Sequence, residues 1–223
     1  MSVATAPAPP PAAAQSRPEP APRLPQRPGG VHRFTLDEYH AMIASGILRE
    51  DDRVELLDGY IVESMSINPP HAAGVYLCSQ LLRSRVDQQT SLVFSERPIA
   101  LPPASEPEPD VVIVALQPDF YATAHPTPAD VTLVVEVADE SLERDREHKL
   151  PRYAEAGLPE YWIVNLRDGQ LERYTDPRPA RPEVGQSAAY AKTEVFGRGQ
   201  VLNHETLGEL TVDDLLPAAA SQK

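Results

Sequence analysis

The stretch that decides the fold, LVVEVADESLERDREHK (133–149), joins an apolar strand pattern to a cluster of charges. Successive side chains of a strand point to opposite faces, so Glu136 lies on the other face from Val135 and Val137. An unpaired carboxylate in an apolar layer either takes a proton or finds a cation. The pattern predicts a strand over 131–138 whose Glu136 pairs with an arginine or water at the strand end, or helps to hold a metal ion.

The segments that follow and precede this strand predict an α/β sandwich around a mixed sheet. Short runs rich in β-branched and aromatic residues, separated by Pro- or Gly-bearing loops, are typical of strands. The expected strands are VFSE (93–96), DVVIVAL (110–116), VTLVVEVA (131–138), EYWIVNL (160–166) and QLERYT (170–175), with a helix between the third and the fourth. The nearly continuous apolar character of the second and third indicates central strands covered on both faces. The expected fold class is α/β, a mixed β-sheet flanked by helices.

Two helices and a hairpin are predicted ahead of the sheet. Residues 34–48 form a helical pattern with a threonine–glutamate capping box at the start and a glycine at the end. Residues 53–65 predict a hairpin, because Asp58-Gly59 between apolar runs suits the positive φ of a tight turn. Residues 69–86 predict a second helix, opened by an Asn-Pro pair and carrying one apolar face.

Composition divides the 223 residues into a tail, one domain and a short end. The Pro/Ala-rich segment 1–30 is too poor in buriable side chains to fold and predicts a disordered tail, followed by a domain over 31–217 and a short tail over 218–223. The first segment carries +2, which leaves −15 for 31–223 out of the chain's −13. This acidity argues against broad adhesion to nucleic acid but is compatible with a metal site, where carboxylates accumulate.

The numbers and positions of cysteine, histidine and apolar residues indicate where in the cell the protein is expected and which metal site is not expected. A single cysteine, Cys78, cannot form an internal disulfide, and neither a signal-peptide pattern nor a run of about 18 apolar residues is present. We therefore expect a cytoplasmic protein with no membrane role. The six histidines form no HxxxH pair, so a zinc site is not indicated.

A pair of carboxylates predicts a magnesium or manganese site. Asp110 follows Pro109 at the start of one expected strand, and Glu136 lies within the next. If these strands are neighbours, their backbones are about 4.8 Å apart and both carboxylates can reach one ion. Magnesium prefers oxygen ligands, and the backbone carbonyl of Val137 offers a third.

Several motifs taken together resemble a known family. They are ELLDG (55–59), PPH (69–71), Pro109-Asp110, VVEV (134–137), the series Asp145, Lys149 and Tyr153, and GLPEYWIVN (157–165). In order and spacing, over about 33–216, they resemble the Uma-two family of restriction-endonuclease-like proteins within the PD-(D/E)XK nuclease superfamily. The resemblance implies a restriction-endonuclease-like core and a metal-dependent endonuclease acting on DNA, with a homodimer as the expected assembly.

The resemblance also implies roles for individual residues. Asp110 and Glu136 are expected to bind the metal, and Glu55 to add a metal or water contact. The superfamily lysine two positions after the glutamate is replaced here by Ala138, so Lys149 is the expected substitute, on a helix predicted to start near Glu147 so that Pro151 falls in its first turn.

Several positions also have a purely structural explanation. Lys149 could be one of several solvated charges, and Glu55 a half-exposed strand carboxylate. For His71 we expect a capping or surface contact, and for Trp162 core packing instead of base stacking. The rival function is a non-catalytic regulatory or protein-interaction module of the same fold; a glycosidase has little support, because no cluster of sugar-stacking aromatic residues is evident.

Overall fold

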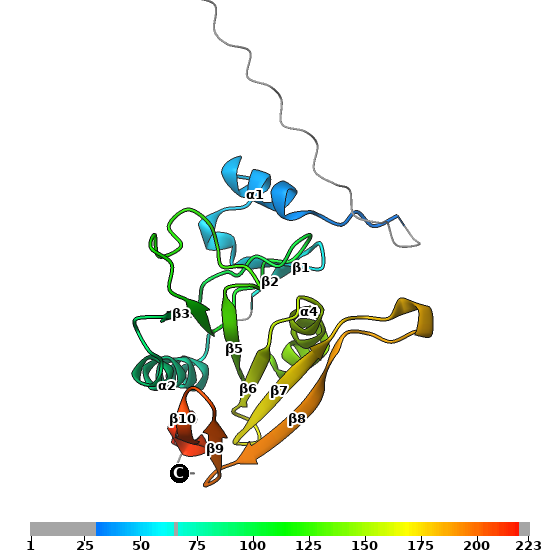
Figure 1. Cartoon of the computed structure of the whole chain (residues 1–223). Coiled ribbons are helices and arrows are strands. Elements are labelled where there is room, and N and C mark those ends of the chain that lie inside the picture. The colour runs from blue at the N-terminus through cyan, green and yellow to red at the C-terminus, as the bar shows by residue number, and fades with distance from the viewer. Residues whose placement is uncertain (1–29, 65–66, 219–223) are drawn as a thin grey trace, which may run out of the picture.

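The computed structural model describes residues 30–64 and 67–218 and has the element order shown in Figure 1. The predicted tails therefore lie outside the described residues, except for Gly30 and Ala218. The helices are α1 (Leu36–Ala44), α2 (Pro69–Arg85), α3 (Leu142–Arg144) and α4 (Leu150–Glu155), with a π-helical turn, η2 (Asp145–Lys149), joining the last two. The strands are β1 (Val54–Leu57), β2 (Tyr60–Glu63), β3 (Ser91–Ser95), β4 (Val111–Ala115), β5 (Val131–Ala138), β6 (Glu160–Asn165), β7 (Gln170–Arg178), β8 (Ala189–Gly197), β9 (Val201–His204) and β10 (Gly208–Thr211). Across these described ranges, no helix combines the length and apolar character needed to span a bilayer.

The six-stranded sheet confirms the predicted fold class. Its strand order is β3-β4-β5-β6-β7-β8, with β5 and β6 parallel and the other neighbours antiparallel. The five strands expected from sequence form its first five positions. The edge strand β8 was not predicted, because most of its side chains are exposed and it lacks a long apolar run. The hairpin β9–β10, also not predicted, lies beside α2 (Figure 1).

The N-terminal elements follow the predicted local signals closely. Thr35 caps α1, and its side chain and that of Glu38 form the reciprocal capping box. In the β1–β2 hairpin, Asp58 and Gly59 both adopt positive φ, 52° and 79°. This hairpin is held to the rest of the domain by the backbone, since the Gly59 N–H donates to the Ala104 carbonyl. Figure 1 shows the hairpin and α1 together at one end of the molecule.

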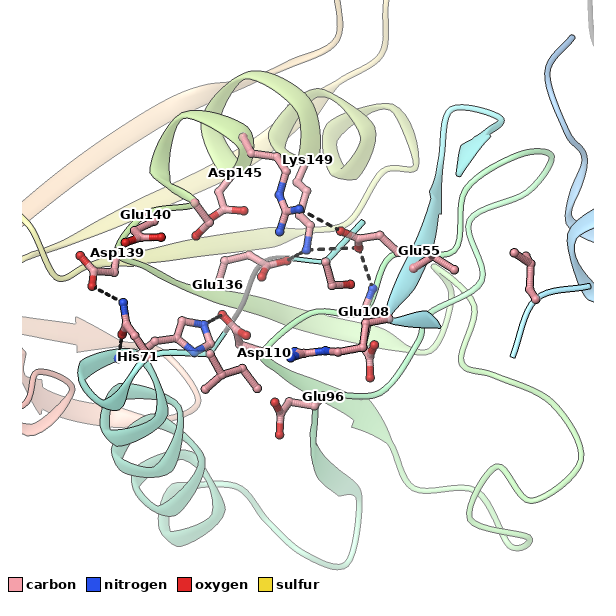
Figure 2. Close-up of a pocket in the computed structure, with 18 of the residues that line it drawn as sticks. Glu55, His71, Glu96, Glu108, Asp110, Glu136, Asp139, Glu140, Asp145 and Lys149 are labelled. Carbon is pink, nitrogen blue, oxygen red and sulfur yellow. Dashed lines mark hydrogen bonds and ion pairs between the residues drawn. The ribbon is translucent and has the colours of Figure 1, made fainter. Parts of the chain in front are cut away.

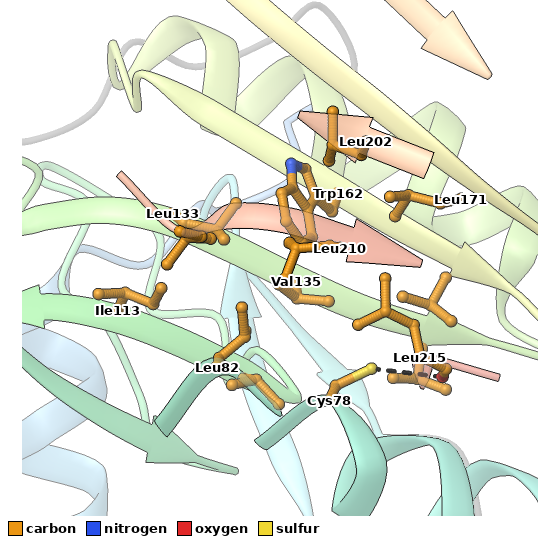
Figure 3. Close-up of a cluster of buried hydrophobic side chains, with 14 of the residues drawn as sticks. Cys78, Leu82, Ile113, Leu133, Val135, Trp162, Leu171, Leu202, Leu210 and Leu215 are labelled. Atoms are coloured by element: carbon orange, nitrogen blue, oxygen red, sulfur yellow. Dashed lines mark hydrogen bonds between the residues drawn. The ribbon is translucent and has the colours of Figure 1, made fainter. Parts of the chain in front are cut away.

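Helices and strands cover both faces of the sheet, as the apolar runs of β4 and β5 predicted. On one face, α2 and the C-terminal segment pack over Val135 and Trp162 (Figure 3). On the other face, α4 supplies Tyr153 and Ala154 to a second cluster with Val134 and Ala138. Trp162 is fully buried, which confirms core packing for this residue.

The helical segment before β6 begins earlier than predicted. It starts at Leu142, not near Glu147, and runs through α3, η2 and α4. In the π-helical turn the Leu150 N–H donates to the carbonyl of Asp145, five residues back. Pro151 follows directly and has no N–H to donate, so the widened turn lets the helix continue through it. The prediction failed because it treated proline as the marker of a new helix start.

Gly74 marks the point where α2 approaches β5 most closely. A Cβ at this position would lie 2.7 Å from Cγ1 of Val137, a short and stiff side chain in the core. We expect Gly74→Val to destabilise the protein by about 2 kcal/mol or more in urea unfolding, because overpacking there must displace the helix or the strand. The control is Ala73→Val on the exposed side of the same helix, which keeps the β-branched penalty alone. Equal losses for the two variants would show that the close approach has no energetic consequence.

A buried polar cluster on β6, away from the pocket described below, gives a pH-dependent stability. Burial alone would raise the pKa of Glu160, but hydrogen bonds from His204, Arg173 and Trp162 prevail and lower it from 4.5 to about 2. A carboxylate with a lowered pKa in the folded state stabilises the protein above its unfolded pKa and loses that effect as pH falls to the folded value.

We therefore expect Glu160→Gln to lower the free energy of unfolding at pH 7 by about 3 to 3.5 kcal/mol, because each pKa unit of the shift from 4.5 to about 2 corresponds to about 1.4 kcal/mol. The difference from wild type should shrink as pH falls from about 4.5 to about 2. Urea unfolding across this pH range is the measurement. Glu194→Gln is the control, because Glu194 contacts the same arginine but its side chain is half exposed. A Glu160→Gln deficit that stays constant with pH would contradict this assignment.

Candidate metal and catalytic site

The register of β4 and β5 brings the two predicted metal ligands together. The strands are antiparallel neighbours, with Val111 opposite Val135, so Asp110 at the entry of β4 lies beside Glu136 on β5. Both side chains line a pocket of about 530 Å³ between the sheet, the N-terminal end of α2 and the helical segment 142–155 (Figure 2).

Glu136 is held by two donors from that helical segment. Lys149 Nζ lies 3.0 Å from Oε1, and Tyr153 Oη donates to the same oxygen at 2.8 Å. The three residues are almost entirely buried, with Glu136 and Lys149 each 3% exposed. The alternative of a solvated charge is therefore wrong for Lys149, although its neighbours Arg146, Glu147 and His148 are exposed.

Asp110 is held by a backbone and a side-chain donor. Its Oδ2 accepts the N–H of Val137 at 2.7 Å and lies 3.2 Å from Nε2 of His71. The amide of His71 is capped by Asn68 Oδ1, so the backbone does make the expected capping contact. The expectation for the ring was wrong: it points into the pocket because position 71 faces the sheet in the first turn of α2.

Glu55 reaches the same lysine from the β1–β2 hairpin. Its Oε2 lies 3.3 Å from Lys149 Nζ and accepts the backbone N–H of Glu108 at 3.1 Å. Glu55 is 2% exposed, so the alternative of a half-exposed strand carboxylate is wrong. Lys149 therefore bridges two buried carboxylates from strands that are not paired with each other.

Negative charge exceeds positive charge in this pocket. The described lining contains eight carboxylates and four cationic side chains: Glu55, Glu96, Glu108, Asp110, Glu136, Asp139, Glu140 and Asp145 against Arg49, Arg53, Arg144 and Lys149. Burial raises the pKa of Glu136 well above its usual value, and Lys149 only partly opposes this. Burial alone would lower the pKa of Lys149, but Glu136, Glu55 and neighbouring carboxylates raise it, so the ammonium stays protonated. A further cation is what such a pocket favours.

Asp145 belongs to the series of residues that resembles the family, and the structure places it in this pocket. It is 1% exposed; Ser141 donates to its Oδ2, while Oδ1 accepts no hydrogen bond from the described residues. Nδ1 of His71 is likewise buried without a partner in the described part of the chain. Unsatisfied buried polar atoms are uncommon in folded proteins, and here two of them lie beside the paired carboxylates.

The donor set fits a divalent cation with oxygen ligands. Within residues 30–64 and 67–218, no three His, Cys, Asp or Glu side chains are grouped as a complete metal cage. Magnesium, however, usually takes one or two carboxylates and retains water. Asp110 and Glu136 each use one oxygen for hydrogen bonds with the described residues, and the structure gives the other oxygen no such partner. The Val137 carbonyl stays a predicted ligand; the structure gives a contact for its N–H.

The missing strand lysine is explained by packing. Ala138 shares a strand face with Glu136, but its side chain is fully buried in the apolar cluster that includes Leu142 and Tyr153. A lysine at 138 would have to enter this cluster, whereas Lys149 brings its ammonium to Glu136 from the helical segment above (Figure 2).

Comparisons with known proteins identify the family and support the fold. The Uma2 (Uma-two) family, described as "Putative restriction endonuclease", matches residues 36–217. A crystal structure described as a "putative nuclease belonging to DUF820" from Anabaena variabilis has a TM-score of 0.62 and 16% identity, covering 82% of this chain and 97% of that one. At this identity the likeness shows the fold. No match was found among curated proteins.

Proposed function

The chain belongs to the Uma2 family of restriction-endonuclease-like nucleases, and from this premise we propose that it is a magnesium- or manganese-dependent endonuclease that hydrolyses phosphodiester bonds in DNA. The observation that carries the proposal is the convergence of Asp110, Glu136 and Lys149 in one acidic pocket. Three groups of these types are the parts that metal-assisted phosphodiester hydrolysis requires.

In this proposal Asp110 and Glu136 would hold the divalent ion. The bound ion would lower the pKa of a water molecule and polarise the phosphoryl oxygen. Lys149, which the neighbouring carboxylates keep protonated despite its burial, stabilises the negative charge that develops on the phosphate. Glu55 keeps the ammonium of Lys149 directed at the pocket through its second contact, at 3.3 Å. His71 and the Val137 amide orient Asp110.

The test is cleavage of supercoiled plasmid and of a single-stranded oligonucleotide in magnesium, manganese or EDTA. We expect the wild type to cut with metal and not with EDTA, and Asp110→Asn to lose at least about 100-fold in rate, as removal of a charged metal ligand would cause. The two substrates distinguish a double-strand from a single-strand preference. Asp130→Asn is a control, because Asp130 lies outside the pocket and caps a turn at Thr127.

Two results would contradict the proposal. Cutting that persists in EDTA would exclude the metal, and equal rates for Asp110→Asn and wild type would remove Asp110 from the reaction. No cutting of either substrate, together with measurable metal binding, would favour the non-catalytic module of the same fold.

The assembly and the location also stay proposals. We propose that the protein forms a homodimer, as the family resemblance implies. We also propose that it is located in the cytoplasm, because its single cysteine, Cys78, is a free and buried thiol, 3.7 Å from the Leu215 carbonyl. Light scattering coupled to size-exclusion chromatography measures the assembly directly.

A further inference from the structure

Two donors on one helical segment contact a single oxygen of Glu136. Lys149 and Tyr153 are four residues apart, so their side chains emerge on the same side of the segment. Both contact Oε1, at 3.0 and 2.8 Å, and Oε2 accepts no hydrogen bond from any residue in 30–64 or 67–218. One carboxylate oxygen, Oε1, is therefore held by the protein, and the other, Oε2, is available to a ligand in the pocket.

The Tyr153 hydroxyl is suited to fixing this arrangement. The residue is fully buried, and its ring packs against Tyr161 with centroids 4.9 Å apart, so the side chain has little freedom to turn away. An ordinary tyrosine keeps its proton near neutral pH, so the hydroxyl donates to Oε1 of Glu136, at 2.8 Å. The lysine ammonium, by contrast, divides its contacts between Glu136 and Glu55.

We propose that Tyr153 is a positioning residue that holds Oε1 of Glu136 and so directs Oε2 towards the divalent cation. This inference rests on the proposed metal-dependent function. We expect Tyr153 to increase the metal affinity. Without its hydroxyl, the Glu136 carboxylate would have to be ordered when the ion binds, which costs binding free energy.

The test measures metal affinity by isothermal calorimetry with Mn²⁺ and Mg²⁺ on the full chain, without DNA. Tyr153→Phe removes only the hydroxyl, and we expect its affinity to fall by about 10-fold, within the range found for groups that orient metal ligands. The matched control is Tyr190→Phe. Tyr190 belongs to the same apolar cluster and is 8% exposed, but its hydroxyl donates to the Leu158 carbonyl, away from the pocket.

A second measurement separates positioning from general destabilisation. In plasmid cleavage, Tyr153→Phe should need about 10-fold more metal for half-maximal rate and should approach the wild-type rate at saturating metal. Thermal unfolding of both variants compares their stabilities. A purely structural role would lower the melting temperature of both variants and leave the metal dependence of both at wild-type values.

The outcomes separate this inference from the proposed function. Metal affinity of Tyr153→Phe equal to that of wild type, with Asp110→Asn strongly weakened, would overturn the role of Tyr153 and leave the metal site standing. Asp110→Asn and Glu136→Ala both binding metal like the wild type would overturn the proposed function, and the role of Tyr153 with it.

Discussion

Replacing Lys149 with methionine is expected to lower the rate of metal-dependent cleavage by about 100- to 1,000-fold, the usual loss when one preorganised charge donor is removed from a transition state. The ammonium is buried and lies 3.0 Å from Glu136 and 3.3 Å from Glu55, so water cannot readily replace it. Single-turnover cleavage of plasmid at saturating Mg²⁺ is the measurement.

Metal binding by the same variant distinguishes a role of the lysine in the reaction from a role in folding. Loss of the ammonium leaves the pocket more negative, so we expect Lys149→Met to bind Mg²⁺ at least as tightly as the wild type in calorimetry. The control is Lys192→Met, on the exposed edge strand β8. A variant that binds Mg²⁺ normally and still cuts at the wild-type rate would exclude Lys149 from the chemistry. Loss of both metal binding and the folded circular dichroism spectrum would instead assign Lys149 to the fold.

Trp162→Ala is expected to cause the largest loss of stability, about 3 to 5 kcal/mol in the free energy of unfolding. The indole is fully buried on β6, on the sheet face that α2 and the C-terminal segment cover (Figure 3), and its Nε1–H donates to Glu160 at 2.5 Å. Truncation leaves a cavity and removes a donor from a buried carboxylate.

Urea unfolding followed by circular dichroism measures this effect. The control is Val195→Ala on β8, where the side chain is 53% exposed and the loss should stay within about 0.5 kcal/mol. A loss of less than about 1 kcal/mol for Trp162→Ala would contradict the packing described here.

Much of the site could be predicted from local pattern. Glu136 was predicted because it interrupts an apolar strand run, where a carboxylate needs a partner, and Asp110 because it follows a proline at the start of the neighbouring strand. Lys149 was found only through the family resemblance, since its neighbours in sequence are mostly exposed charges. His71 was assigned to a cap or the surface, because a helix start by itself does not show which way the first turn faces.

The strands at the end of the domain mark another limit of local pattern. The predicted strands β4, β5 and β6 have apolar or aromatic runs that are almost entirely buried, whereas β8 is an exposed edge strand. It forms a strand because it pairs with β7, where Glu172 lies opposite Val195. This pairing joins residues about 20 positions apart in the sequence, which a local pattern does not show. Likewise the π-helical turn at Asp145–Lys149 depends on how the segment packs, and proline alone suggested a later start.

The sequence by itself determined the strand alternation, the capping box of α1, the Asp58-Gly59 turn and the face on which Glu136 lies, because these depend on residues within a few positions of one another. Only the tertiary structure decided that Lys149 and Tyr153 meet at Glu136, that Glu55 contacts the same lysine, and that His71 meets Asp110. These contacts join separate elements, so they depend on strand order and helix packing, which no short stretch of sequence specifies.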